Sequence, residues 1–208
     1  MKSNGFTLIE ILVTIAIVAV LSSVVIANVT QGRDVALNSA ITSQVSEYKK
    51  AISAVKIDSG SYPQTSDWSS GVYDRLYCLG TDRCGFCTTP DCSTTNGVYN
   101  GNFSSRLTSE IPSLPPITKV PISISGTNFI GGAYHCLVSD SVNSRCALVE
   151  ILFAQKSRNT CRNSGLPVNQ VISDGINSLC YVVLPAQRNE ISDSHYNSLP
   201  ANIKAFFY

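Results

Sequence analysis

The N-terminal segment constrains this chain most, because it contains a long apolar run. Residues 6–27 are 22 consecutive positions with one charged side chain, Glu10, and without glycine or proline. A helix rises about 1.5 Å per residue, so this run would be about 33 Å long and would match the roughly 30 Å hydrocarbon core of a membrane. The run is therefore predicted to cross a membrane once, and Lys2 before it favours a cytoplasmic N-terminus.

From the residues alone, this run has three interpretations. It is a plain membrane anchor, a secretory signal peptide that is cut after Ala27, or a segment in which Glu10 has a function of its own. A carboxylate in a spanning segment costs about 2.5 kcal/mol or more at the centre and less near the interface, so such residues usually have a partner. A plain membrane anchor does not require a carboxylate at this position. In a signal peptide, a charge within the apolar core would impair its function. Glu10 therefore favours the third interpretation.

Residues 5–13, Gly-Phe-Thr-Leu-Ile-Glu-Ile-Leu-Val, resemble the N-terminal signature of type IV pilins and of the pseudopilins of type II secretion. The resemblance implies that residues 1–5 are a leader peptide, that a prepilin peptidase cuts after Gly5, and that the new amine on Phe6 is methylated. It also implies that Glu10 neutralises the N-terminal amine of a neighbouring subunit. Both charges would be costly if unpaired in an apolar filament core, so their pairing would set the register between subunits.

The two polar side chains of this segment, Thr7 and Glu10, also have plainer alternatives. Glu10 could simply lie at the membrane interface, and Thr7 could be a passive helix residue. If the chain is a pilin, Thr7 could add a hydrogen bond to the filament-assembly site that contains Glu10. The signature covers only about the first 27 residues, so it predicts the kind of assembly and leaves the rest of the chain open.

The helix is predicted to continue past the membrane as far as Ser59. Apolar residues recur three or four positions apart and form one stripe, as on an amphipathic helix. The stripe consists of Leu37, Ile41, Val45, Tyr48, Ile52 and Val55. Residues 60–63, Gly-Ser-Tyr-Pro, end the pattern and resemble the turn after the spine helix of many pilins and pseudopilins. The sequence thus predicts a spine helix over residues 6–59, with 6–27 in the membrane and the remainder packed on a sheet.

Residues 60–208 are predicted to form a globular head outside the cytoplasm. Residues 64–116 are rich in Ser, Thr, Gly and Asn and carry four cysteines, which indicates a stapled loop region. Strand patterns follow at Ile117–Ile124, Ala133–Val138, Ala147–Ala154 and Leu179–Leu184. The second and third are predicted to form a hairpin, and Pro121 marks the first as an edge strand. This order predicts an α+β fold: a long spine helix on a small antiparallel β-sheet of three or four strands, rich in disulfides.

Eight cysteines are many for a chain of 208 residues. They are Cys78, Cys84, Cys87, Cys92, Cys136, Cys146, Cys161 and Cys180. Outside the cytoplasm they are expected to form disulfides, and a zinc or redox cluster around the Cys-x-x-Cys element at residues 84–87 is the alternative. Eight cysteines allow about a hundred pairings. Two of these have a geometric basis: Cys136 with Cys146 beside the hairpin turn, and Cys161 with Cys180 around a loop with Gly, Pro and Asn.

The sequence gives little support for an enzyme or for a metal site. The two histidines are His135 and His195, and neither belongs to a recognisable nucleophile–base pair. Glu190 and Asp193 could bind calcium, but solvated turn residues explain them as well. We expect no catalytic residue, cofactor or metal.

Nucleic acid is not expected as a partner either. The charged fraction is 14% and the formal net charge is +1, so no strong positive field surrounds the chain. Four arginines in the second half could share a patch, although scattered basic residues on a neutral domain usually only solubilise it. They are Arg145, Arg158, Arg162 and Arg188.

Together these patterns predict a structural subunit, major or minor, of a type IV pilus-like filament. Before assembly the subunit would be held in the cytoplasmic membrane by a single pass, and afterwards it would belong to an extracellular or periplasmic filament. Its partners would be identical or related pilin subunits and the prepilin peptidase. The alternatives are a pseudopilin of a type II secretion system and a membrane-tethered, disulfide-rich binding domain that does not polymerise.

Overall fold

The structure is a computed structural model of the chain, and its two compact units are Met1–Leu37 and Asn38–Tyr208. The described residues are 7–63, 75–80, 83–89, 91–115, 117, 120–140, 145–157, 161 and 166–208. Helix α1, Leu8–Ser59, supplies the described part of the first unit after Thr7 and the first 22 residues of the second unit. The prediction of one long N-terminal helix followed by a sheet is confirmed.

In the first unit, the apolar side chains of α1 are exposed on every side of the helix. Those from Leu8 to Val29 are between 51% and 76% exposed, and Glu10 is exposed among them. Leu, Ile and Val favour burial, because each apolar Å² removed from water stabilises by about 25 cal/mol. This half of the helix therefore requires an apolar environment that other molecules supply.

In the second unit, the apolar stripe of α1 faces the interior, as predicted. Ile41, Val45, Tyr48, Ile52 and Val55 are at most 3% exposed, and Leu37, the last residue of the first unit, is half-buried. The helix ends at Ser59 because Gly60, with a φ of +71°, adopts the left-handed conformation that closes many helices.

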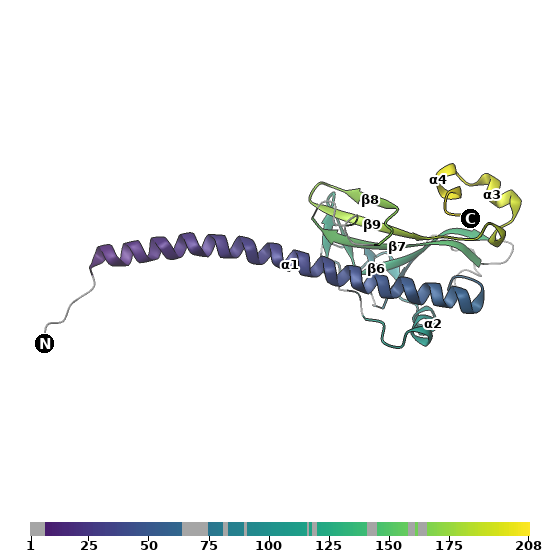
Figure 1. Ribbon diagram of the computed structural model, residues 1–208, viewed down its shortest axis with the longest axis horizontal. Helices are drawn as coiled ribbons and strands as arrows, with labels where there is room; N and C mark the ends of the chain where they lie inside the picture. Colours follow the sequence, from purple (N-terminus) through teal and green to yellow (C-terminus); the bar gives the residue numbers. More distant parts are fainter. Residues whose placement is uncertain are drawn as a thin grey trace. The chain divides into compact units, whose positions relative to one another are not determined.

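The head contains two sheets, which are visible beside α1 in Figure 1. The larger has the order β3-β1-β6-β7-β9-β8, and the smaller has the order β2-β5-β4. The strands of the larger sheet are β1 Leu76–Cys78, β3 Gly97–Val98, β6 Gly132–Asp140, β7 Arg145–Lys156, β8 Gln170–Ser173 and β9 Asn177–Leu184. Those of the smaller sheet are β2 Gly85–Phe86, β4 Ile122–Ile124 and β5 Thr127–Ile130. All pairs are antiparallel except β1 with β3.

The core of the head forms around β7, which lies between β6 and β9. Every residue from Cys146 to Gln155 is buried, so this strand has an almost continuous apolar sequence rather than an alternating one. Helix α2, Gly101–Glu110, covers another part of the core with Phe103 and Leu107. The Phe103 ring lies 4.8 Å from the ring of Tyr134 and 6.1 Å from that of Tyr77, measured between centroids.

The last residues of the chain fold back on the sheet. They form the 3₁₀ helix η2, Arg188–Glu190, and the short helices α3, Asp193–Ser198, and α4, Ala201–Lys204. The segment then pairs with its own beginning, because Ala186 bridges Phe207 in parallel. Tyr196, Leu199, Ile203 and the phenylalanines at 206 and 207 pack on a buried cluster that contains Leu148 and Val183. Residues 186–208 therefore cover part of the core.

The structure differs from the predicted head in three places. The strand expected at Ile117–Ile124 extends only over Ile122–Ile124, with residues 116, 118 and 119 outside the described residues. The expected count of three or four strands was too low, because the described residues form nine. The region 64–116 is not only loop: its described part holds α2 and three strands of two or three residues each, too short to leave a periodic pattern.

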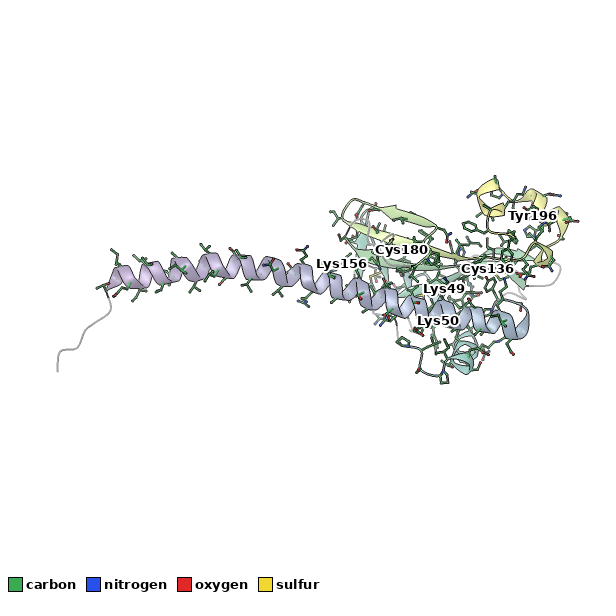
Figure 2. The ribbon with its side chains drawn as sticks, in the orientation of Figure 1. Lys49, Lys50, Cys136, Lys156, Cys180 and Tyr196 are labelled. Atoms are coloured by element: carbon green, nitrogen blue, oxygen red, sulfur yellow. A yellow bond between two sulfur atoms is a disulfide. The ribbon has the colours of Figure 1, made fainter. Side chains whose placement is uncertain are left out.

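Asn38 joins α1 to the end of β7, where its side chain makes the backbone hydrogen bonds that a neighbouring strand would otherwise make. Its side-chain Nδ2 donates to the carbonyl of Lys156 at 2.6 Å, and the Lys156 amide donates to Asn38 Oδ1 at 2.9 Å. Strand β6 begins at Gly132, opposite Phe153, so it does not reach the backbone of Lys156. The Asn38 amide therefore satisfies the two backbone groups that β6 leaves unpaired. Lys156 is labelled in Figure 2.

Replacing Asn38 by Ala should lower the free energy of unfolding of the head by about 2 kcal/mol, because two hydrogen bonds at a buried position are lost. Urea unfolding of the full chain in detergent, followed by near-ultraviolet circular dichroism, measures this loss. The control is Ser43→Ala, on the exposed face of the same helix, which should leave the midpoint unchanged. Equal midpoints for both variants would contradict the assignment.

Asp174 holds two turns together at the end of the head. Its Oδ1 accepts hydrogen bonds from the amides of Ile176 at 2.8 Å and Asn177 at 2.7 Å, and its Oδ2 accepts one from the amide of Ser125 at 2.9 Å. These bonds, with that from Asn177 the largest, lower the pKa of the carboxyl below its ordinary value. The charged form is therefore the one that the fold stabilises.

The stabilisation by Asp174 should disappear in acid. Because the folded-state pKa is lowered, the contribution is present above the ordinary aspartate pKa of about 4 and is lost as the pH falls through the folded-state value. Asp174→Asn should thus be slightly less stable than the wild type at pH 7 and no less stable at about pH 2. Urea midpoints of both proteins across this range provide the measurement. A difference that stays constant with pH would show that the charge of Asp174 plays no part.

Candidate functional site

The first candidate site is the start of α1, where Thr7 and Glu10 form a reciprocal cap. Both the amide and the hydroxyl of Thr7 donate to Glu10 Oε2 at 2.8 Å, and the Glu10 amide donates to Thr7 Oγ1 at 3.4 Å. This is a capping box, in which the first residue before a helix and the third residue within it satisfy each other. The Thr-x-x-Glu spacing is visible in the sequence and could have predicted this geometry, which the sequence analysis missed.

The two oxygens of the Glu10 carboxylate differ in their hydrogen bonds. Both hydrogen bonds from Thr7 end on Oε2, and among the described residues none donates to Oε1. A carboxylate accepts hydrogen bonds at both oxygens, so Oε1 can still accept a hydrogen bond from a cationic group of another molecule. The other two residues predicted for this site, Gly5 and Phe6, lie outside the described residues, and the cleavage and methylation predicted there stay predictions.

The helix that carries the cap is apolar enough to cross a membrane. Among the described residues, α1 alone has the required length and composition, with a mean hydropathy of 2.7 over its most apolar 18-residue window. None of the residues in that window is buried. The start of α1 therefore combines an apolar surface on all sides with one carboxylate at its N-terminal end.

The second candidate region is the disulfide-bonded head, where all eight cysteines are paired. The bonds are Cys78–Cys84, Cys87–Cys92, Cys136–Cys146 and Cys161–Cys180. The last two are the pairs that the predicted hairpin and loop had indicated. Cysteine ligands for a zinc cluster would have to be free thiolates, so the disulfides occupy the groups on which that alternative depended.

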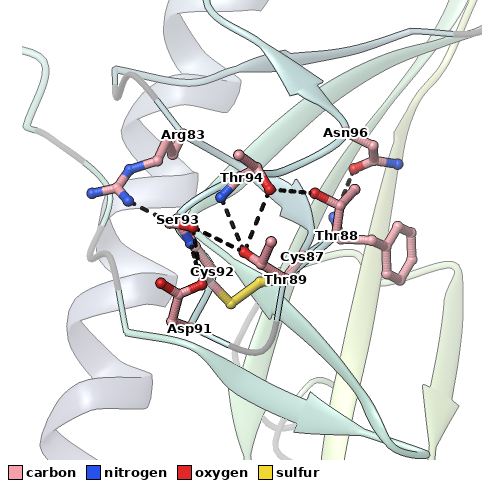
Figure 3. Close-up of a disulfide and its surroundings, with 10 residues drawn as sticks. Arg83, Cys87, Thr88, Thr89, Asp91, Cys92, Ser93, Thr94 and Asn96 are labelled. Carbon is pink, nitrogen blue, oxygen red and sulfur yellow. Dashed lines mark hydrogen bonds between the residues drawn. A yellow bond between two sulfur atoms is a disulfide. The ribbon is translucent and has the colours of Figure 1, made fainter.

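The Cys87–Cys92 bond closes a short loop that is rich in hydroxyl groups (Figure 3). The hydroxyls of Thr88 and Thr94 are 2.6 Å apart, and those of Thr89 and Ser93 are 3.1 Å apart. Asp91 accepts hydrogen bonds from the amide and the hydroxyl of Ser93. The loop is therefore fixed by its own side chains, and the prediction of a stapled region here is confirmed.

Lys56, near the end of α1, connects this helix to the C-terminal segment. Its ammonium lies 3.0 Å from Glu190 Oε1, 3.2 Å from the carbonyl of Pro185 and 4.1 Å from the ring centroid of Tyr62. The Tyr62 hydroxyl donates to the same carbonyl at 2.6 Å. Burial raises the pKa of Tyr62 well above its ordinary value, with smaller contributions from Glu190 and Tyr208. The tyrosine of the Gly-Ser-Tyr-Pro turn is thus an anchor for the C-terminal segment.

The other candidate residues make structural contacts. His135 lies opposite Glu150 on β6 and β7, with 2.8 Å between Nδ1 and Oε1. The amide of His195 in α3 donates to the hydroxyl of Ser192, the residue that caps this helix. Glu190 pairs with Lys56, and Asp193 pairs with Arg188. No group of three or more metal-binding side chains occurs within the described residues.

Of the four arginines that could form a nucleic-acid-binding patch, the structure describes the side chain of Arg188 alone. Arg158 and Arg162 lie outside the described residues, and Arg145 is described only through its backbone in β7. Arg188 lies over the ring of Tyr196, 4.0 Å from its centroid, and is paired with Asp193. A shared basic patch therefore remains an untested hypothesis.

Comparison with known proteins agrees with the geometry at the start of α1. Residues 1–26 match a family model described as the prokaryotic N-terminal methylation motif. The type IV wide pilus major component PilA4 of Thermus thermophilus is 31% identical over 121 residues, which are 49% of this chain and 89% of the relative. The chain belongs to the type IV pilin family.

The pilin family includes the pseudopilins of type II secretion, and one of these is also similar. The type II secretion system core protein G of Klebsiella michiganensis is 36% identical over 64 residues, which are 31% of this pilin-family chain. The match spans only 45% of the length of the Klebsiella protein. No solved structure matches the chain.

Proposed function

We propose that the chain is a structural subunit of a type IV pilus-like filament. It would be made as a precursor, with residues 1–5 as the leader, residues 6–59 as the spine helix and residues 60–208 as the head. A prepilin peptidase would cut between Gly5 and Phe6, and the amine of Phe6 would be methylated. The observation that carries the proposal is the combination, at one end of a helix, of an all-round apolar surface and a single capped carboxylate.

Close packing of the apolar helices would drive assembly. Before assembly, residues 6–27 would lie in the cytoplasmic membrane with the head outside the cytoplasm. In the filament, the same side chains would pack against the helices of neighbouring subunits. Lipid and packed helices are similarly apolar, so transfer from one to the other costs little, and close packing supplies the gain.

Glu10 would select where the next subunit binds. Cleavage gives Phe6 a free, positively charged amine, and this amine would donate a hydrogen bond to the open Oε1 of Glu10 on a neighbouring subunit. Thr7 would hold Glu10 by Oε2 and so keep Oε1 turned outward. Thr7 would then be a positioning residue, and Thr7→Ser, which keeps the hydroxyl, should assemble better than Thr7→Ala.

The mature N-terminus tests the processing steps directly. Mass spectrometry of the chain from native membranes or sheared fibres should find Phe6 as the first residue with one added methyl group. A chain that begins at Asn28 would indicate a secreted head without its spine. An intact Met1 would indicate a plain anchor, and either of these results would overturn the proposal.

The second candidate is a pseudopilin of a type II secretion system, because part of the chain is similar to core protein G. The two candidates differ in where the filament lies. A pilus subunit should be recovered from sheared fibres on the cell surface, whereas a pseudopilin should remain with the cell envelope, and its deletion should stop the export of folded proteins. A membrane-tethered domain that does not polymerise would give neither result.

A further inference from the structure

A pocket in the second unit lies near the end of α1, far along the chain from Glu10. One face of α1 forms one wall, and the end of β9 with the C-terminal segment forms the other. The volume is about 550 Å³, within the range of about 300–1,000 Å³ that is common for pockets that bind small molecules. Its lining includes Lys49, Ser53, Lys56, Ile57, Leu184 and Tyr208.

Lys49, labelled in Figure 2, brings a positive charge to this pocket without a carboxylate to balance it. Its side chain is partly buried, and within the described part of the chain its ammonium makes neither an ion pair nor a hydrogen bond. The neighbouring Lys50 differs, because it is exposed and its ammonium lies 2.8 Å from Glu47 Oε1. A partly buried ammonium loses some of its hydration, so an unpaired one favours an anionic partner.

The second lysine of the pocket, Lys56, already has its partners. An ammonium has three hydrogens, and that of Lys56 contacts Glu190 Oε1, the carbonyl of Pro185 and the ring of Tyr62. Because the charges of Lys56 and Glu190 balance, the side chains in the described lining carry one uncompensated charge, on Lys49. The pocket therefore suits one anionic group, and Glu190 would repel a second one near Lys56.

Ser53 lies about one turn after Lys49 on the same face of α1. Residues four positions apart on a helix have Cβ atoms about 5–6 Å apart, so one carboxylate can contact both the serine hydroxyl and the flexible lysine ammonium. The Ser53 hydroxyl has no hydrogen-bond partner among the described residues. It is also accessible, unlike the enclosed Oγ of Ser104. Lys49 and Ser53 therefore provide two donors that a single carboxylate can reach.

Apolar side chains line the rest of the pocket. Leu184 is buried, whereas Ile57 and Tyr208 are 85% and 73% exposed. These two are the most exposed large apolar side chains in the described part of the second unit. A ligand that covers them would remove apolar surface from water, which is favourable. The pocket thus suits an anion with an apolar body better than an inorganic ion.

We propose that this pocket binds a small organic monocarboxylate. Its carboxylate would accept hydrogen bonds from the Lys49 ammonium and the Ser53 hydroxyl, and its apolar body would lie against Leu184, Ile57 and Tyr208. The bond from the ammonium is charge-assisted and therefore stronger than a bond between neutral groups. The site belongs to a single subunit, so the proposal does not rest on filament assembly.

The test uses the full chain in detergent micelles with ¹³C-labelled isoleucine methyl groups and 3-phenylpropanoate as the probe. We expect a saturable shift of the Ile57 signal, which Ile57→Val assigns. The neutral 3-phenylpropanamide has nearly the same shape and should bind at least about tenfold more weakly, because it lacks the charge. Ile176, 72% exposed between β8 and β9, controls for partition into the micelle, and its signal should not move.

Variants of α1 assign the binding to the two donors. Lys49→Gln should weaken binding at least about tenfold, and Lys49→Arg should retain most of it. Lys50→Gln removes the same charge at the next position and should bind as the wild type does. Ser53→Ala, which keeps a good helix former in place, should weaken binding about fivefold.

Four results would overturn the proposal. The first is an Ile57 signal that does not shift saturably, and the second is equal affinity for the acid and the amide. The third is wild-type affinity in both Lys49→Gln and Ser53→Ala, and the fourth is an Ile176 shift that follows that of Ile57. The isoleucine spectra of the free variants show whether each retains the fold, and Ser53→Ala decides alone if Lys49→Gln does not.

Discussion

Glu10→Gln is expected to reduce the amount of sheared filament to below about a tenth of the wild-type level, while the processed chain still accumulates in the membrane. The neutral amide keeps the size and the capping acceptor of Glu10, but it cannot neutralise the N-terminal amine of the next subunit. An unpaired amine in an apolar filament core costs several kcal/mol, and about 1.4 kcal/mol per contact already lowers association tenfold. Immunoblots of sheared and membrane fractions measure the two pools.

Two further variants make this experiment specific. Glu10→Asp keeps the charge on a shorter side chain and should retain part of the assembly. Glu47→Gln, on the part of α1 that belongs to the head, removes the same charge elsewhere and should assemble as the wild type does. Wild-type amounts of fibre from Glu10→Gln would refute the role of this carboxylate, and loss in Glu47→Gln would mean that charge in general matters.

The second large effect is expected from the Cys161–Cys180 disulfide. The bonded residues are 19 positions apart, and on the chain-entropy model closing a loop of this length stabilises the fold by about 3 kcal/mol. Both cysteines are completely buried, and Cys180, labelled in Figure 2, lies in β9, which pairs with β7. The double variant Cys161→Ala/Cys180→Ala should therefore lose about 3 kcal/mol in free energy of unfolding.

The Cys87–Cys92 disulfide provides the matched comparison. Its cysteines are only 5 positions apart, so its removal by the same double substitution to Ala should cost about 2 kcal/mol. Guanidinium unfolding of the full chain in detergent gives both numbers. A larger loss for the 87–92 pair would show that loop length does not govern the stability of this head.

The spine and the long strands could be predicted from the sequence because their signals are local. The stripe from Ile41 to Val55 repeats at helical spacing, and β7 and β9 are long apolar runs bounded by turn residues. In the same way, the sequence pattern of the hairpin formed by β6 and β7 predicted that Cys136 pairs with Cys146. These features need no knowledge of distant parts of the chain.

The features that were missed depend on distant or very short segments. Asn38 looks like an ordinary polar helix residue, and its partner Lys156 is 118 positions away. Helix α2 consists mainly of polar residues, and only the spacing of Phe103 and Leu107 after a capping Asn100 indicates it.

The pairing order of the cysteines has a consequence for biosynthesis. Each cysteine is bonded to the next one along the chain, without crossing or nesting. With the spine held in the membrane and its N-terminus in the cytoplasm, the head would be exported from residue 60 onward and would expose its thiols to the oxidant in this same order. Oxidation of each pair as it emerges would then give the native set directly, so we expect the head to mature with a simple thiol oxidase and little need for a disulfide isomerase.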